Sequence, residues 1–355
     1  MKKIALLLIF SLLMFAFRAN AESDVIKEVF LNLNRDYINE LSNKEIAIKG
    51  LHSLAKTSPH ISVAEEGQSL VLYQNQKPVE QFDFPSDIDD IDVWTAWCQN
   101  IIEEASKIDK NLETHDFELP DKFAVAVFEG LDGYSHYFSV FNDTVSDEPL
   151  KIRRPFASRI IDKILLIKIL SFKKDISSNV RSAVEECSKC EALILDLRNN
   201  HGGFLDEALK IADMFLDEGI ITYTLSPQNN LPNYYTAGRG DILEGKPIVI
   251  LTDGLTASAA EVLAAALSEQ DRAVIIGTKT YGKGSIQDVT KMDADRAMAV
   301  TTAYFYTPSG IKIDKTGLTP FICVMEDENC APMDRFNKEE DIDLAVQYLQ
   351  NGNAL

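Results

Sequence analysis

Residues 193–216 read LILDLRNNHGGFLDEALKIADMFL. The apolar run Leu193–Leu197 is short, and it leads through polar residues and two glycines into a stretch with helical apolar spacing from Leu205 to Leu216. This order predicts a buried strand, a tight turn and a helix. Such units are the building blocks of α/β domains.

The same alternation continues on both sides of this stretch. Further strands are predicted at 164–169, 248–251, 274–276 and 298–305, and further helices at 177–187 and 259–267. Residues 339–349 carry apolar side chains at helical spacing and predict one amphipathic helix near the end of the chain. The fold class predicted for this region is therefore α/β.

The region before this domain has a different pattern. Residues 22–140 are predicted to be mainly helical, with a capping box at Ser42–Glu45 and a short hairpin over 68–84. We expect a mainly helical N-terminal domain over 22–145, a core domain over 146–333 and a C-terminal helix within 334–355.

The first 21 residues predict a cleavable secretory signal. Lys2 and Lys3 precede an apolar run from Ile4 to Phe17, and small residues stand at the third-last and last positions of Ala19-Asn20-Ala21. An uncleaved N-terminal anchor is the alternative interpretation. No later stretch is apolar enough to span a bilayer, so we expect no membrane span after signal removal, and a periplasmic or secreted protein. The formal net charge of −20 disfavours binding to nucleic acid or to anionic membrane surfaces.

All five cysteines follow the predicted signal. Cys323 and Cys330 bracket a short acidic loop that a disulfide could close in an oxidising compartment. Cys187 and Cys190 form a C-x-x-C pattern, for which a structural disulfide or plain thiols are preferred over a redox or metal role. No second C-x-x-C pattern and no nearby histidine supports zinc, so no metal and no cofactor are expected. Cys98 is the odd cysteine.

Ser258 follows a predicted strand and stands at the start of an alanine-rich helix. One interpretation is that Ser258, or Thr256, is simply the N-cap of this helix. The other is catalytic, because free N–H groups and the positive end of the helix dipole favour the negative charge that develops on an oxyanion.

Two glycine-rich segments allow two interpretations each. The turn at Gly202-Gly203 is either an ordinary strand-to-helix connection or a place where backbone N–H groups are exposed to a ligand. Lys283 stands between Gly282 and Gly284, a setting that a surface lysine does not need and that would let a lysine approach a nucleophile closely. Phosphate binding is the other interpretation, but the Walker spacing is absent.

Four segments in order resemble the carboxyl-terminal processing peptidases, the tail-specific serine proteases of peptidase family S41. The segments are DLRNNHGG at 196–203, TASAAE at 256–261, TYGKGSIQ at 280–287 and TPSG at 307–310, and the likeness extends over about 162–324. The resemblance implies a ClpP/crotonase-like core of β-β-α units. It also implies a serine-type peptidase, a hydrolase that acts on protein or peptide substrates.

The resemblance assigns roles to five residues. Ser258 falls on the nucleophile, Lys283 on the general base and Gln287 on the third member, while the N–H groups of Gly203 and Ala259 fall on the oxyanion hole. A neutral lysine can take the serine proton, and burial in an apolar pocket favours the neutral form. His201 lies beside the expected oxyanion hole, replaces a residue that is often proline or glycine in the family, and is expected to be a bystander.

One departure from the family pattern limits the functional prediction. Only the stretch from about Phe141 to Arg159 fills the place where family members commonly carry a PDZ domain, and it is too short for that fold. The leading hypothesis is an exported endopeptidase that cleaves in or near C-terminal tails, as a homo-oligomer or with an adaptor protein. A catalytically silent scaffold and a non-peptide acyl hydrolase on the same core are the alternatives.

Overall fold

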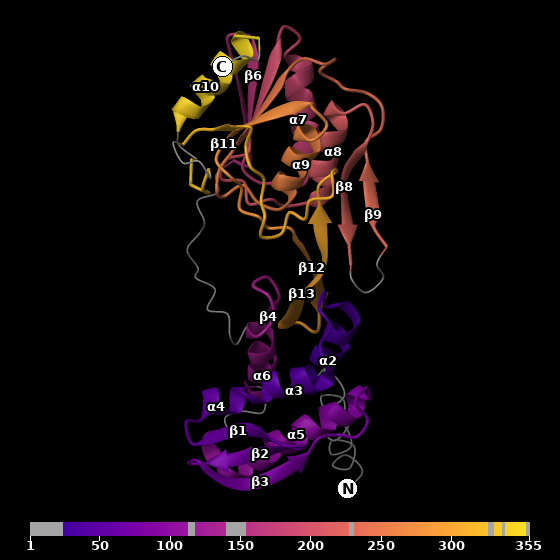
Figure 1. Cartoon of the computed structure of the whole chain (residues 1–355), viewed down its shortest axis with the longest axis vertical. Coiled ribbons are helices and arrows are strands. Elements are labelled where there is room, and N and C mark those ends of the chain that lie inside the picture. Colours follow the sequence, from indigo (N-terminus) through magenta and orange to yellow (C-terminus); the bar gives the residue numbers. More distant parts are fainter. Residues whose placement is uncertain are drawn as a thin grey trace, which may run out of the picture. The chain divides into compact units, whose positions relative to one another are not determined.

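The computed structural model describes residues 24–112, 118–139, 154–226, 231–325, 330–335 and 338–352. The predicted signal at 1–21 lies outside these residues. The chain divides into two compact units, one of residues 1–147 with 287–302 and the other of 148–286 with 303–355 (Figure 1). The return of 287–302 to the first unit has no counterpart in the sequence patterns, and the predicted domain limits stay a prediction.

The first unit combines helices with a three-stranded antiparallel sheet. Its elements are α2 (Val25–Asp36), α3 (Asn43–Leu51), α4 (Ser53–Thr57), β1 (Ile61–Glu66), β2 (Ser69–Gln74), β3 (Lys77–Asp83), α5 (Ile91–Ile108), η1 (Lys110–Leu112), α6 (Glu118–Glu129) and β4 (His136–Ser139). The predicted hairpin over 68–84 is confirmed as β2 and β3, and the capping box of Ser42 and Glu45 is present at the start of α3. Strand β1 was not predicted, because only Ile61 and Val63 of its six residues are apolar side chains turned into the core.

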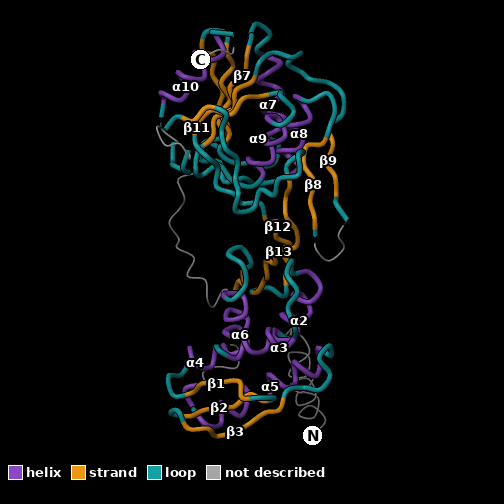
Figure 2. The backbone as a smooth tube through the Cα atoms, in the orientation of Figure 1, coloured by secondary structure: helices purple, strands orange, loops and turns teal. Residues whose placement is uncertain are grey.

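The second unit is built on a six-stranded sheet. Its elements are β5 (Phe156–Ile161), β6 (Ile164–Ile169), α7 (Ile176–Glu186), β7 (Ala192–Asp196), α8 (Leu205–Phe215), β8 (Ile220–Leu225), β9 (Asn233–Thr236), β10 (Ile248–Thr252), α9 (Ala259–Ser268), β11 (Ala273–Gly277), β14 (Ile322–Cys323) and α10 (Glu339–Gln350). The strand order is β14-β11-β10-β7-β6-β5, parallel except for the β5–β6 pair (Figure 2). The predicted mixed α/β class is confirmed.

The remaining strands form a long hairpin and its neighbours. β12 (Ser285–Lys291) and β13 (Arg296–Tyr306) each run from one unit into the other along the chain. Residues 296–299 of β13 pair with β4, and residues 304–306 pair with β8.

The six-stranded sheet is covered on both faces. Side chains of β6 and β7 alternate, so that Ile167 and Leu195 join the large core under α7, α8 and α9, whereas Leu166 and Ile194 face α10. Parallel strands buried on both faces consist almost wholly of apolar residues, which is why β7 and β10 were predicted to within one residue, at 193–197 and 248–251. Among the described residues, no helix is both long and apolar enough to cross a membrane.

The structure contains the two disulfides that the sequence left as possibilities. Cys323 is bonded to Cys330 and Cys187 to Cys190, both within the second unit, and the free Cys98 is buried in the first unit.

Candidate active site

Ser258 has an uncommon backbone conformation. Buried strand β10 ends at Thr252, a turn follows, and Ser258 stands directly before α9 with φ 57° and ψ −123°. An N-cap residue normally has extended backbone with negative φ, and a residue with a side chain at positive φ is strained by about 1–3 kcal/mol. Strain of this kind is found most often at functional sites. Simple helix capping therefore does not account for the conformation of Ser258.

The glycine turn after β7 lies against Ser258. A side chain at Gly202, where φ is +96°, would place its Cβ 2.9 Å from the Ser258 Cβ and 3.2 Å from the Ala259 nitrogen. Asn200 fixes this approach, because its side-chain oxygen accepts the Gly202 N–H at 2.8 Å and its backbone oxygen accepts the Ala257 N–H at 2.9 Å. Glycine is thus required by the contact between the turn and the start of α9.

Two backbone donors flank this contact. Gly203 has φ +139° and packs so tightly on Phe172 that a Cβ would lie 2.4 Å from the Phe172 carbonyl oxygen. Within the part of the chain that the structure describes, the N–H groups of Gly203 and Ala259 have no hydrogen-bond acceptor. Both residues adjoin the contact between Gly202 and Ser258, and Ala259 is the first residue of α9, at the positive end of the helix dipole.

Glu261 joins the Ser258 turn to the segment that carries Lys283. Its side chain is fully buried; one carboxylate oxygen accepts the N–H groups of Ser258 and Lys283, both at 2.9 Å, and the other accepts the Gly282 N–H at 2.8 Å and the Thr280 hydroxyl at 2.5 Å. Burial raises the pKa of Glu261 above its ordinary value, while these hydrogen bonds oppose the rise. A single carboxylate therefore fixes the backbones of Ser258 and Lys283 relative to each other.

The sequence prediction missed Glu261 although a signal was present. Serine followed three residues later by glutamate is the capping-box pattern, and here the glutamate does accept the N-cap N–H. The additional bonds to 280–283 cannot be read from that pattern, because they join residues 19 to 22 positions apart.

Lys283 is half-buried and lies on a tightly packed loop. A side chain at Gly284 would place its Cβ 2.1 Å from the Asp314 nitrogen, and one at Gly282 would place it 3.0 Å from the Gly317 nitrogen. The flanking glycines are explained by backbone packing against 314–317. This packing, together with Glu261, determines the path of the Lys283 backbone.

The chain is similar to known peptidases over this same region. Residues 163–324 match the family described as peptidase family S41. These residues form a peptidase family S41 domain. The chain is 35% identical over 192 residues to a carboxy-terminal-processing protease of Bartonella bacilliformis, a match that covers 50% of this chain and 44% of the relative.

A second relative and a solved structure are also similar to this chain. A chloroplastic carboxyl-terminal-processing peptidase 2 of Arabidopsis thaliana is 39% identical over 183 residues, which cover 50% of this chain and 36% of the relative. The chain thus matches less than half the length of these relatives. The crystal structure of a putative peptidase from Parabacteroides merdae has the same fold, with a TM-score of 0.50 and 15% identity over 89% of this chain and 100% of the other.

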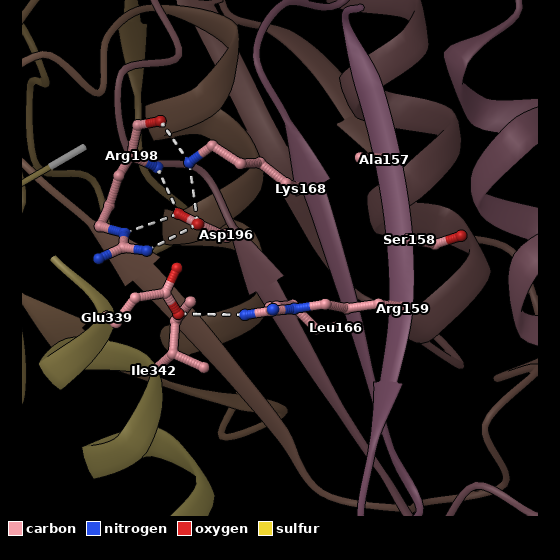
Figure 3. Close-up of a pocket in the computed structure, with 9 residues that line it drawn as sticks. All are labelled: Ala157, Ser158, Arg159, Leu166, Lys168, Asp196, Arg198, Glu339 and Ile342. Carbon is pink, nitrogen blue, oxygen red and sulfur yellow. Dashed lines mark hydrogen bonds and ion pairs between the residues drawn. The ribbon is translucent and has the colours of Figure 1, made fainter. Parts of the chain in front are cut away.

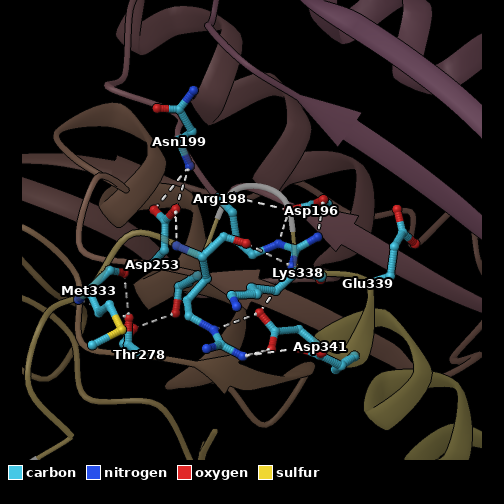
Figure 4. Close-up of polar contacts among 12 residues, drawn as sticks. Asp196, Arg198, Asn199, Asp253, Thr278, Met333, Lys338, Glu339 and Asp341 are labelled. Atoms are coloured by element: carbon cyan, nitrogen blue, oxygen red, sulfur yellow. Dashed lines mark hydrogen bonds and ion pairs between the residues drawn. The ribbon is translucent and has the colours of Figure 1, made fainter. Parts of the chain in front are cut away.

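A second buried carboxylate lies at the end of β7 in the S41 domain. Asp196 accepts hydrogen bonds from the Arg198 guanidinium at 2.8 Å and from the Lys168 ammonium at 2.9 Å (Figure 3). Burial raises the pKa of Asp196, but the bonds and charges of these two cations outweigh it, so the pKa lies below its ordinary value. Arg198 also donates to Asp341 of α10 at 3.0 Å, so that the network joins the sheet to the C-terminal helix (Figure 4).

A pocket of about 320 Å³ lies beside this network. It is lined by side chains of β5, β6, β7 and α10, among them Lys168 and Asp196, and by Arg198, which follows β7 (Figure 3). None of the five residues predicted to be catalytic or to form the oxyanion hole lines this pocket.

Two residues named by the sequence analysis lie outside the contacts described above. The Gln287 side-chain amide donates to the Thr301 hydroxyl at 3.3 Å, and both residues belong to the first unit. Its role toward Lys283 stays a prediction. His201 is exposed, and its side chain makes no hydrogen bond or ion pair with the described residues. Those residues also contain no group of three or more metal-ligating side chains.

Proposed function

We propose that this chain is an exported serine endopeptidase in which Ser258 is the nucleophile and Lys283 the general base. The observation that carries the proposal is the strained Ser258 backbone, held against the Gly202-Gly203 turn and joined through Glu261 to the backbone of Lys283. Strain is maintained only where the surrounding structure enforces it. Here it is enforced at the one serine that the family resemblance also selects.

The proposed reaction is acyl transfer through a covalent intermediate. The neutral amine of Lys283 takes the proton of the Ser258 hydroxyl as its oxygen attacks the substrate carbonyl, and then gives that proton to the departing amine. Water attacks the resulting ester by the reverse of these proton movements, which regenerates the Ser258 hydroxyl. Gln287 is proposed to orient the lysine amine without adding negative charge.

The oxyanion is proposed to be held by the N–H groups of Gly203 and Ala259. Both lack a protein acceptor within the described ranges, so they can donate to a charged oxygen without first breaking another bond. Preorganised donors of this kind typically contribute about 2.7–4 kcal/mol each to transition-state stabilisation.

The proposed substrates are extended segments of exported proteins, in or near their C-terminal tails. The tail preference follows from the names of the relatives, which are carboxy-terminal-processing proteases. Export is proposed from the basic and apolar pattern of residues 1–21 and from the two disulfides, which form in oxidising compartments.

The decisive experiment compares wild type with Ser258→Ala. Wild type should hydrolyse unfolded, tail-exposed proteins and should form a fluorophosphonate adduct that mass spectrometry locates on Ser258, whereas the variant should do neither. Equal hydrolysis by the two proteins would exclude this mechanism. Absence of any Ser258 adduct would favour the scaffold alternative. Hydrolysis of simple esters but not of peptides would favour the acyl hydrolase.

A further inference from the structure

A short segment near the C-terminus contacts the turns that lead to both proposed catalytic residues. Residues 330–335, here called the strap, follow β14 and precede α10 in the second unit. The Met333 carbonyl oxygen accepts the N–H of Gly254 at 2.8 Å. It also accepts the hydroxyl of Thr278 at 3.1 Å (Figure 4). One peptide group of the strap thus bonds to both turns at once.

The contacts fall at equivalent places in the two turns. Asp253 and Gly254 precede Ser258 by five and four residues, and Thr278 and Lys279 precede Lys283 by the same steps. In the first turn, Asp253 accepts the N–H of Arg335 at 3.2 Å. In the second, the Lys279 N–H donates to the Cys330 carbonyl oxygen at 3.3 Å. The strap therefore spans the exits of β10 and β11, where both turns begin.

The fit of the strap to the first turn is close. A side chain at Gly254 would place its Cβ 2.7 Å from the Met333 nitrogen and 2.9 Å from the Pro332 carbonyl carbon. Interiors packed this closely transmit small displacements rather than absorbing them. A shift of the strap should therefore displace Gly254, where the turn that leads to Ser258 begins.

Each end of the strap is anchored. Cys330 is bonded to Cys323, which pairs with Gly277 at the end of β11. At the other end the Arg335 guanidinium donates to Asp341 of α10 at 2.7 Å, and the Arg335 carbonyl oxygen accepts from Arg198 at 3.2 Å. A covalent bond holds the strap beside the turn that leads to Lys283, and an ion-pair network holds it to α10.

We propose that the strap is a positioning element that sets the separation of the Ser258 and Lys283 turns, and that the Cys323–Cys330 disulfide holds it in place. The inference rests on the proposed peptidase function. Glu261 joins the two turns on the side of the catalytic residues, and the strap joins them at the strand exits. Because misplacement of reacting groups by about 1 Å can lower a rate about hundredfold, a loosened strap should slow catalysis without abolishing the fold.

The chain contains a matched control for this disulfide. Cys187–Cys190 lies in the same unit and closes a short loop after α7, and neither cysteine is among the residues described above as contacting the strap or either turn. Cys323→Ser/Cys330→Ser should lower kcat and the rate of fluorophosphonate labelling at Ser258 about tenfold, with KM changed less than about twofold. Cys187→Ser/Cys190→Ser should leave all three quantities within about twofold.

A second pair of variants leaves both disulfides intact. Thr278→Val removes the hydroxyl that bonds Met333, while Thr278→Ser keeps it. The valine variant should lose labelling rate and the serine variant should retain it.

The possible outcomes distinguish a failure of the strap inference from a failure of the proposed peptidase function. If wild type forms no Ser258 adduct, the proposed function fails and this inference fails with it. If wild type is labelled and Cys323→Ser/Cys330→Ser is labelled equally fast, the strap inference alone is overturned. Equal losses in the two disulfide variants would also overturn it, because general destabilisation would then explain both.

Discussion

Two buried carboxylates in the S41 domain are stabilised in opposite ways. Glu261 is surrounded by backbone N–H groups and a hydroxyl, whereas Asp196 is bonded to the charged groups of Arg198 and Lys168. The pKa of Glu261 lies above its ordinary value and that of Asp196 below it. Neutral donors fix geometry beside the proposed catalytic pair, and cations bind the sheet to α10.

The largest expected effect is a loss of folding stability when the ion-pair network around Asp196 is disrupted. Arg198→Met removes the cation that bonds both Asp196 and Asp341, and it leaves two buried carboxylates with fewer partners. Breaking a buried ion pair on one side should lower the free energy of unfolding by about 3–5 kcal/mol, with the low end expected because Lys168 and Arg335 remain. Denaturant unfolding measures this change. A loss below about 1 kcal/mol would mean that the network is not a major stabilising contact.

Glu261→Gln should act mainly on catalysis. The glutamine has the same shape, but its NH₂ group would face N–H donors where a carboxylate oxygen accepts them now. We expect kcat to fall about hundredfold as the Ser258 and Lys283 backbones move apart. Glu261→Asp is the matched control, because it keeps the carboxylate charge but has a side chain too short to accept the same hydrogen bonds. It should lose activity as well. Unchanged kcat in Glu261→Gln would show that this carboxylate does not position the pair.

The pH dependence of stability should have opposite signs at the two carboxylates. A raised folded-state pKa means that ionisation of Glu261 destabilises the fold as pH rises above its ordinary value of 4.5. A lowered pKa means that Asp196 stabilises the fold above its ordinary value of 3.8 and that this contribution is lost as pH falls below it.

The two signs can be read from variants. As pH rises from about 2.5 to about 7, the difference in unfolding free energy between wild type and Glu261→Gln should narrow, mainly above pH 4.5. The difference between wild type and Asp196→Asn should widen, mainly below pH 3.8, and each full change is about 1.4 kcal/mol per unit of pKa shift. Denaturant unfolding at several pH values gives both differences. If both stability differences widened, or both narrowed, as pH rises, the opposite pKa shifts of Glu261 and Asp196 would be contradicted.

The smallest effect is expected for an exposed ion pair between the residues that directly precede β6 and β7. Lys163 contacts Glu191 at 2.6 Å, but both side chains are more than 60% exposed. Glu191→Gln should change the free energy of unfolding by less than about 1 kcal/mol, because solvent and salt screen such pairs. A larger loss would show that burial does not explain why the ion pairs of Asp196 stabilise the fold more than that of Glu191.

Local patterns predicted much of the second unit. Strand β6 begins and ends at the predicted residues 164 and 169, and α10 begins at the predicted Glu339. These elements carry their own signal in apolar spacing. The hairpin β8–β9 was not predicted, since most of its side chains are polar or half-exposed and its strands pair with each other and with β13.

Short sequence motifs predicted only part of the candidate site. Ser258, Lys283, Gly203 and Ala259 came from three short segments, and their roles stay predictions that the experiments above test. The contacts of Glu261 with 280–283 and of the strap with Asp253 were not predictable, because they join residues up to 82 positions apart. Folding alone brings such residues together.

The positive φ of Ser258 has an evolutionary consequence. Glycine adopts such a conformation without the steric cost that any other residue carries, so Ser258→Gly should make the fold more stable than wild type while removing the proposed nucleophile. Stability and hydrolysis would then compete at a single position. In a descendant without selection for peptide hydrolysis, substitution of Ser258 by glycine would be favoured. A serine that persists in this backbone conformation would indicate that hydrolysis is still under selection.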